Sequence, residues 1–239
     1  MQTKTILITG ANSGIGLATT KLFLQKGYFV FAHYFSSNDK LKKLNREKLE
    51  MFQSDLSQPK NIAKVFSRCL QKCRKVDVLF NNAGNLSISK NIESIKLKDF
   101  DYALNVNLKA PFLLSQLALK HMKKSNGGRI INISSIGIKY GGNSISAHYT
   151  ISKAAVEAMT ISFAKAGAPY NVLVNAVRAG LTETNMLKSN PAKDMKKRID
   201  LIPLKRLANP KEIAESIYFL ASKESSYVSG SILTVAGGE

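Results

Sequence analysis

The 239-residue chain contains little cysteine, no tryptophan and few acidic residues. Two cysteines, Cys69 and Cys73, cannot form a disulfide framework, and without histidines beside them they predict no metal site. The sequence has no run of about 18 apolar residues, the length that a transmembrane helix requires. Its first residues also lack the pattern of a signal peptide. We therefore expect a cytoplasmic protein with no membrane association.

The charge is strongly unbalanced, because 35 Lys and Arg residues face 16 Asp and Glu residues, for a net charge of +19. Such a balance is typical of proteins that bind nucleic acids or anionic surfaces. The positive residues are spread along the chain rather than gathered in one block. We therefore expect attraction of anionic ligands and no nucleic-acid function.

Strand-like and helix-like segments alternate along the whole chain. The strand-like segments are mostly continuous apolar runs, as expected when helices cover both faces of a sheet. Right-handed crossovers would join them into a mainly parallel, doubly wound seven-stranded α/β sheet within a single domain, residues 1–239. We expect strands at 4–9, 28–34, up to about 54, 76–81, 129–134, 172–177 and 231–235, and helices at 15–26, 59–73, 98–124, 148–166 and 210–222.

Only residues 180–208 interrupt this alternation. A long irregular stretch inside a compact domain is usually a functional loop. We interpret residues 181–208 as a substrate lid.

A glycine-rich turn follows the first strand, in the segment 9–16 (TGANSGIG). Gly10 would permit the tight turn, Gly14 the approach of backbone to a pyrophosphate, and Gly16 the packing of the helix on the sheet. The amino terminus of the next helix offers free N–H groups to that anion. The turn therefore predicts a dinucleotide site, although its glycine spacing differs from the common G-x-G-x-x-G.

A tyrosine and a lysine lie four residues apart on the helix predicted at 148–166. Tyr149 and Lys153 would share one helix face, where the ammonium group would lower the pKa of the phenol. Ser135 ends the preceding strand, at the edge where a parallel sheet binds ligands. His148 adjoins Tyr149, but neighbouring helix positions diverge, so we expect it at the rim of the site.

Together these motifs resemble the short-chain dehydrogenase/reductase family over essentially the whole chain. The resemblance rests on five features in the family's order: the glycine turn at 9–16, Asn81-Asn82-Ala83-Gly84, Ser135, Tyr149-x3-Lys153, and Val235-Ala236-Gly237-Gly238. It implies a Rossmann-like fold and an NAD(P)-dependent oxidoreductase that interconverts a ketone and a secondary alcohol.

The resemblance also implies roles for individual residues. Tyr149 would be the general acid in ketone reduction, and Lys153 would lower its pKa and hold the nicotinamide ribose. Ser135 would bind the substrate oxygen, and Asn107 would hold a water in the proton path. The implied cofactor contacts are Gly10, Asn12, Ser13, Gly14, Ile15, Gly16, Tyr34, Ser36, Asp55, Leu56, Asn82, Ala83, Gly84, Tyr149, Lys153, Gly180, Thr182 and Thr184.

The end of the second strand bears on the choice of cofactor. NAD-preferring family members place an acidic residue there, and this chain has Tyr34, followed by Ser36 and then by lysines from Lys40 onward. A carboxylate would repel the 2′-phosphate of NADP, so its absence favours NADP(H) over NAD(H). Against this, Asn12 and Ser13 lack the basic residue that many NADP users carry in the glycine turn.

The sequence is compatible with three functions: two enzymatic activities within the family and one function of a different class. The overall pattern is most similar to bacterial 3-oxoacyl-[acyl-carrier-protein] reductases, which would make an acyl-carrier-protein thioester the partner. Tyr170 and Asn171 replace the basic residue such reductases tend to carry, and Ala179 replaces a proline before Gly180. The alternatives are a sugar or small-alcohol dehydrogenase, or a non-catalytic cofactor-binding or regulatory protein. The family resemblance further implies a homotetramer.

Overall fold

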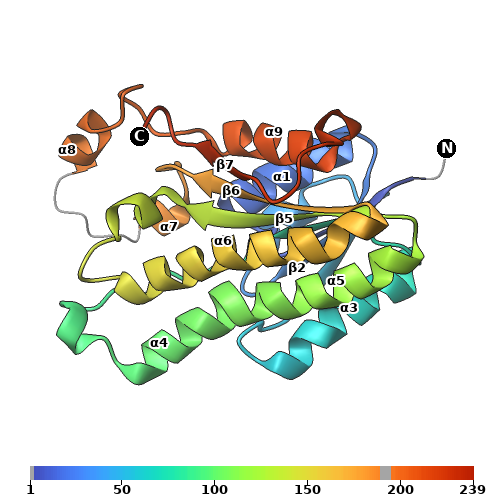
Figure 1. Ribbon diagram of the computed structural model, residues 1–239, viewed down its shortest axis with the longest axis horizontal. Helices are drawn as coiled ribbons and strands as arrows, with labels where there is room; N and C mark the ends of the chain where they lie inside the picture. Colours follow the sequence, from blue (N-terminus) through green and yellow to red (C-terminus); the bar gives the residue numbers. More distant parts are fainter. Residues whose placement is uncertain (1–2, 189–194) are drawn as a thin grey trace.

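A computed structural model describes residues 3–188 and 195–239 (Figure 1). Within them, seven strands form one sheet in the order β3-β2-β1-β4-β5-β6-β7, and every pair of neighbours is parallel. This confirms the predicted doubly wound sheet, with strand ends within two residues of those expected. The strands are β1 (Thr5–Ile8), β2 (Phe29–Tyr34), β3 (Leu49–Gln53), β4 (Val78–Asn81), β5 (Gly128–Ser135), β6 (Val172–Ala179) and β7 (Ile232–Val235).

Helices cover both faces of the sheet, and each layer encloses its own apolar core. On one face lie α3 (Pro59–Cys73), α5 (Ala110–Lys124) and α6 (Ala147–Gly167); on the other lie α1 (Gly14–Gln25) and α9 (Pro210–Ala221) (Figure 1). Alternate residues of a strand supply opposite cores: Leu7 packs toward α3 and α5, and its neighbours Ile6 and Ile8 pack in the core with α1 and α9. The strands are therefore apolar on both sides, as their sequences predict.

The helix predicted at 98–124 is wrong in one respect, because a wide turn divides it. Its parts are α4 (Leu97–Leu104), a π-helical turn (Asn105–Lys109) and α5. A π turn adds a residue to the helix and is common at functional sites. Here it carries the buried Asn107, whose amide bonds outside the helix are described below. Apolar periodicity does not reveal such an insertion.

A buried chain of amides and hydroxyls crosses the centre of the sheet. The Asn81 Nδ2 donates to Asn132 Oδ1 on the neighbouring strand (2.8 Å) and to Ser115 Oγ on α5 (3.0 Å). The Asn132 Nδ2 in turn donates to Thr160 Oγ1 on α6 (2.9 Å). These bonds tie β4 and β5 to the two long helices in one arrangement.

The segment expected to be irregular contains two short helices, α7 (Asn185–Lys188) and α8 (Met195–Asp200). Residues 189–194 of the predicted lid lie outside the described residues. The two ends of the segment meet, because Thr182 and Ala208 form a parallel bridge. The segment therefore leaves the end of β6 at Thr182 and returns beside it at Ala208.

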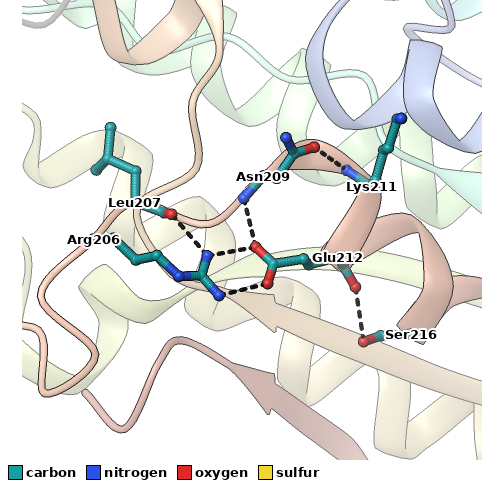
Figure 2. Close-up of polar contacts among 6 residues, drawn as sticks. All are labelled: Arg206, Leu207, Asn209, Lys211, Glu212 and Ser216. Carbon is teal, nitrogen blue, oxygen red and sulfur yellow. Dashed lines mark hydrogen bonds and ion pairs between the residues drawn. The ribbon is translucent and has the colours of Figure 1, made fainter.

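A polar clamp fixes the returning end of this segment to α9 (Figure 2). The Arg206 guanidinium donates to both carboxylate oxygens of Glu212, at 2.8 and 2.7 Å. The same carboxylate accepts from the Asn209 N–H (2.7 Å), and the Asn209 side chain accepts from the Lys211 N–H (3.0 Å). Asn209 and Glu212 form a capping box, which satisfies N–H groups at the start of α9.

The smaller elements are the helix α2 (Asp39–Lys42) and the 3-10 turns η1 (Ile92–Ser94), η3 (Ile136–Tyr140), η4 (Ala168–Tyr170) and η5 (Lys223–Ser225). In the described parts of the chain, no helix combines the length and apolarity that crossing a bilayer demands.

Candidate active site

A cavity of about 880 Å³ lies at the carboxyl edge of the sheet. Its walls come from the glycine turn, the ends of β4 and β5, the start of α6 and the segment after β6. Most predicted site residues line it: Gly10, Asn12, Ser13, Gly14, Ile15, Ser36, Asp55, Leu56, Asn82, Ala83, Gly84, Ser135, Tyr149, Lys153, Gly180, Thr182 and Thr184. Gly16, Tyr34 and Asn107 are outside this lining.

The glycine turn has the geometry of a close-approach site. Gly10 and Gly14 have φ values of +65° and +50°, which L side chains rarely adopt. A Cβ on Gly16 would lie 2.1 Å from the Gly10 carbonyl oxygen, so this glycine lets α1 pack under the turn. Gly16 therefore shapes the site from below its surface, and the turn leaves backbone open to the cavity at Gly10 and Gly14.

His33 braces this turn from β2, a role that the sequence did not indicate. The Gly10 N–H donates to His33 Nδ1 (3.4 Å), and His33 Nε2 must donate to the Ser54 carbonyl (2.9 Å). The two bonds define a neutral ring with the proton on Nε2. Burial lowers the pKa of His33 to about 4, so the ring stays neutral near pH 7.

Tyr34 lies at the end of β2 but turns away from the cavity. Its ring packs in the core shared with α1 and α9, and its hydroxyl accepts from Asn38 Nδ2 (2.8 Å). His33, Phe35 and Ser36 line the cavity at this point. Counting residues located the strand end correctly but did not show which side chains face the cavity.

The central side chains of the site converge from β5 and α6. Lys153 Nζ lies 5.8 Å from the centre of the Tyr149 ring and donates to the Ile133 carbonyl (3.0 Å). Ser135 Oγ accepts from the Gly137 N–H (3.2 Å). These contacts place a hydroxyl, a phenol and an amine on one wall of the cavity.

The acid–base properties differ from the expected lowering of the Tyr149 pKa. Desolvation raises the pKa of Tyr149, and its hydrogen bond with Ser135 opposes that rise. Burial lowers the pKa of Lys153 to about 8. The prediction of a lowered tyrosine pKa is therefore wrong, because desolvation outweighs the hydrogen bond with Ser135.

Asn107 lies behind the cavity wall, in the π turn. Its Oδ1 accepts from the Asn85 N–H (2.7 Å), and its Nδ2 donates to the Asn85 carbonyl (2.9 Å) and to Ser152 Oγ (3.0 Å). Gly84 lies between Asn107 and Lys153: a Cβ there would be 3.5 Å from Asn107 Oδ1 and 3.7 Å from Lys153 Nζ. Asn107 is thus close to the lysine without lining the cavity.

Comparison with known proteins places this geometry in a family. A family model described as enoyl-(acyl carrier protein) reductase matches residues 10–239. A 3-oxoacyl-[acyl-carrier-protein] reductase of Thermotoga maritima is 39% identical over the whole chain and 98% of that protein. The chain belongs to the short-chain dehydrogenase/reductase family. Its activity class is therefore that of an oxidoreductase that uses a nicotinamide cofactor.

The relatives with similarity over the full length do not all have the same name. A 3-oxoacyl-[acyl-carrier-protein] reductase of Aquifex aeolicus is 34% identical over the whole chain and 98% of that protein. A 2-dehydro-3-deoxy-D-gluconate 5-dehydrogenase of Bacillus subtilis is 35% identical, over 98% of this chain and 94% of that protein. Similarity of this degree therefore identifies the family rather than the substrate.

The described residues fit the cofactor that short-chain dehydrogenase/reductases use. Gly14 faces Thr184, whose methyl carbon would lie 2.9 Å from an added Cβ, and Gly10 is similarly close to Ala83. These bare backbone surfaces flank the helix start that would receive the pyrophosphate. Lys153 and Gly180 line the same cavity.

Two further residues, Glu157 and Arg178, support the cavity wall that carries Ser135, Tyr149 and Lys153, and they were not predicted. The Glu157 carboxylate accepts from Ser134 Oγ (2.7 Å) and from Arg178 Nε and Nη2 (2.9 and 2.6 Å). It thereby joins α6 to the ends of β5 and β6. Glu157 lies one turn after Lys153, and that spacing is the only signal the sequence offered.

His148 is not at the rim, as expected, but fully buried. A hydrogen bond of 2.6 Å joins its Nε2 to Ser87 Oγ. The ring packs inward because α6 starts against the loop that follows β4. Asn81, the first residue of the motif at 81–84, turns into the sheet, where it forms the amide chain described above.

Proposed function

We propose that the protein reduces the keto group of a 3-oxoacyl thioester, with an acyl-carrier-protein conjugate as substrate. The observation that carries this proposal is the meeting of Ser135, Tyr149 and Lys153 on one cavity wall, in a chain similar over its full length to reductases of that name. The volume of the cavity, about 880 Å³, is within the range of small-molecule and cofactor sites.

The described residues support a division of labour in this reaction. When bound, the reduced cofactor supplies a hydride to the carbonyl carbon. The Ser135 hydroxyl donates a hydrogen bond to the carbonyl oxygen, and the Tyr149 phenol transfers its proton to that oxygen as the alcohol forms. Lys153 stabilises the phenolate that remains. Asn107, which lies behind the cavity wall near Lys153, positions a water that returns the proton.

Replacement of the proton donor tests the proposal. Tyr149→Phe should reduce kcat for acetoacetyl thioester by about 10²–10⁴-fold, because general acid catalysis is worth that much. Binding of the cofactor, followed by its fluorescence, should persist. Tyr170→Phe is the matched control, since Tyr170 lies on the surface beneath Lys123. Loss of less than about tenfold in Tyr149→Phe would refute the assigned role.

A dehydrogenase acting on a sugar acid is the second candidate. The Bacillus subtilis relative carries such a name and is almost as similar as the reductases. A panel of 3-oxoacyl thioesters, keto sugar acids and neutral ketones, each assayed with the reduced cofactor, separates the two. Turnover of the sugar acids alone would replace the reductase proposal with this one.

We further propose a preference for NADP(H). At the end of β2 the described cavity lining presents His33, Phe35 and Ser36, and none of these would repel a 2′-phosphate. Asn12 donates to the Ser37 carbonyl (2.9 Å), which fixes the loop facing that position. Titration of one preparation with NADPH and with NADH decides the matter, and tighter binding of NADH would overturn the preference.

We also propose that the chain forms a homotetramer and works in the cytoplasm. Large apolar side chains are exposed on the outer faces of α5 and α6, among them Phe112, Ile151 and Ile161. Such a surface is typical of an interface between subunits. The free thiols of Cys69 and Cys73 support a reducing compartment.

A further inference from the structure

Arg198, on α8, lies at the mouth of the cavity and lines it. On one side its guanidinium forms an ion pair with Glu239, beyond the end of β7. On the other side it lies 5.7 Å from the centre of the Tyr140 ring, in the turn that follows Ser135. Arg198 therefore spans the mouth between the segment after β6 and the catalytic wall.

The charges on the cavity wall make this position distinctive. Among the described lining residues, Lys153 and Arg198 are the only lysine or arginine, and Asp55 is the only carboxylate. The ammonium group of Lys153 already has a partner, because it donates to the Ile133 carbonyl beside Tyr149. Arg198 thus supplies the permanent positive charge at the mouth.

The pairing of Arg198 leaves it able to receive a second anion. Its described hydrogen bond uses Nη2 and one oxygen of Glu239, whereas a guanidinium has five N–H donors in a planar fork. The Glu239 side chain is only 1% exposed, against 29% for Arg198. The carboxylate is therefore the buried anchor, and Arg198 is the more exposed partner and the one that lines the cavity.

We propose that Arg198 binds an anionic oxygen group of the substrate, a phosphate or a carboxylate remote from the reacting carbonyl. Planar N–H donors suit both groups, and the bond is charge-assisted. A phosphate would come from the pantetheine arm of a thioester, and a carboxylate from a keto acid. The inference rests on the proposed function, since it concerns the substrate of the same cavity.

Pairs of ligands that differ only in the anionic group test whether Arg198 binds that group. The oxidised cofactor is present, so that the ligands bind without turnover. Acetoacetyl-4′-phosphopantetheine is compared with acetoacetyl-pantetheine by calorimetry, and a 5-keto sugar acid with its amide. In the wild type the anionic member of one pair should bind at least tenfold tighter, and that pair identifies the source of the anion. Equal affinity within both pairs would overturn the inference.

Two variants separate anion binding from a purely structural ion pair. Arg198→Met should abolish the preference for the anionic ligand, and Arg198→Lys should restore part of it. Glu239→Gln breaks the same ion pair but keeps the guanidinium, so it should retain the preference or increase it. If Glu239→Gln lost the preference as completely as Arg198→Met, Arg198 would serve only to hold α8.

The outcome is distinguishable from failure of the proposed function. A wild type that binds the phosphorylated ligand selectively but reduces no 3-oxoacyl thioester refutes the reductase and supports the anion site. A wild type that reduces both thioesters with equal KM, and binds the keto sugar acid no tighter than its amide, supports the reductase and refutes the anion site.

Discussion

At the scale of single residues, burial fixes the protonation states on which the site depends. His33 is neutral because both ring nitrogens have assigned partners, the Gly10 N–H and the Ser54 carbonyl. A protonated ring would present a second N–H to the Gly10 N–H, where no acceptor exists. The glycine turn is therefore stable only while His33 remains uncharged.

This coupling predicts a loss of stability in acid. The pKa of His33 is about 4 in the folded protein and 6.5 by its ordinary value, so the unfolded chain takes up the proton first as the pH falls. Stability should decline from pH 6.5 to about 4, by roughly 3 kcal/mol from this group. Urea unfolding at pH 7 and pH 4.5 should show a smaller decline in His33→Gln than in the wild type. Equal declines would exclude His33 as the cause.

Lys153 is expected to lower the stability of the folded protein while it serves turnover. Its folded-state pKa of about 8 lies below the ordinary 10.5, so charging it costs stability that is regained as the pH rises from about 8 to 10.5. Lys153→Met should lose turnover. At pH 7 and without ligands, its free energy of unfolding should nevertheless rise by about 2 kcal/mol, after allowance for the lost hydrogen bond to Ile133. Denaturation at pH 7 and pH 10.5 should show this gain shrinking at the higher pH.

At the scale of elements, the start of α9 holds the returning end of the segment after β6. Asn209→Ala removes the side chain that accepts from the Lys211 N–H, and loss of such a cap costs about 1 kcal/mol. Thermal unfolding should register a lower Tm. Ser216→Ala is the control, because its exposed hydroxyl only bonds back to the Glu212 carbonyl within the helix. An unchanged Tm in Asn209→Ala would show that the clamp with Arg206 suffices alone.

Much of this architecture could be predicted because periodicity reports burial. The apolar runs located all seven strands, and the position of Gly27, with φ of +82°, marked the end of α1. The π turn could not be predicted, since its extra residue leaves the apolar stripe of the helix intact. Side-chain direction at strand ends was equally hidden: Tyr34 turns into the core with α1 and α9, and Asn81 turns toward α5, so neither lines the cavity.

The candidate site was predictable where backbone geometry demands particular residues, and not where packing decides. The positive φ values of Gly10 and Gly14 left a signature in the sequence. The supports of the site, His33 and Glu157, act through contacts between distant elements and carry no motif. The same holds for Arg198, whose partner Glu239 is 41 residues away.

At the scale of the whole molecule, assembly should follow from the apolar faces of α5 and α6. Light scattering at micromolar concentration should give the mass of a tetramer. Ile161→Glu places a charge on that face, since Ile161 is 42% exposed, and should reduce the mass. Leu97→Glu, at a 74% exposed position on α4, should not. A monomeric wild type would contradict the proposed assembly.

The amide chain through Asn81, Asn132 and Thr160 has a consequence for how the chain folds. Sliding β4 by one residue against β5 would turn the Asn81 amide into the opposite apolar core and bring Phe80 in front of Asn132. Each stranded amide group would cost about 1–3 kcal/mol, whereas an all-apolar pair of strands would tolerate the slip. Two amides at the centre of the sheet, with Thr160 on α6, thus favour the correct pairing during folding, before any ligand is present.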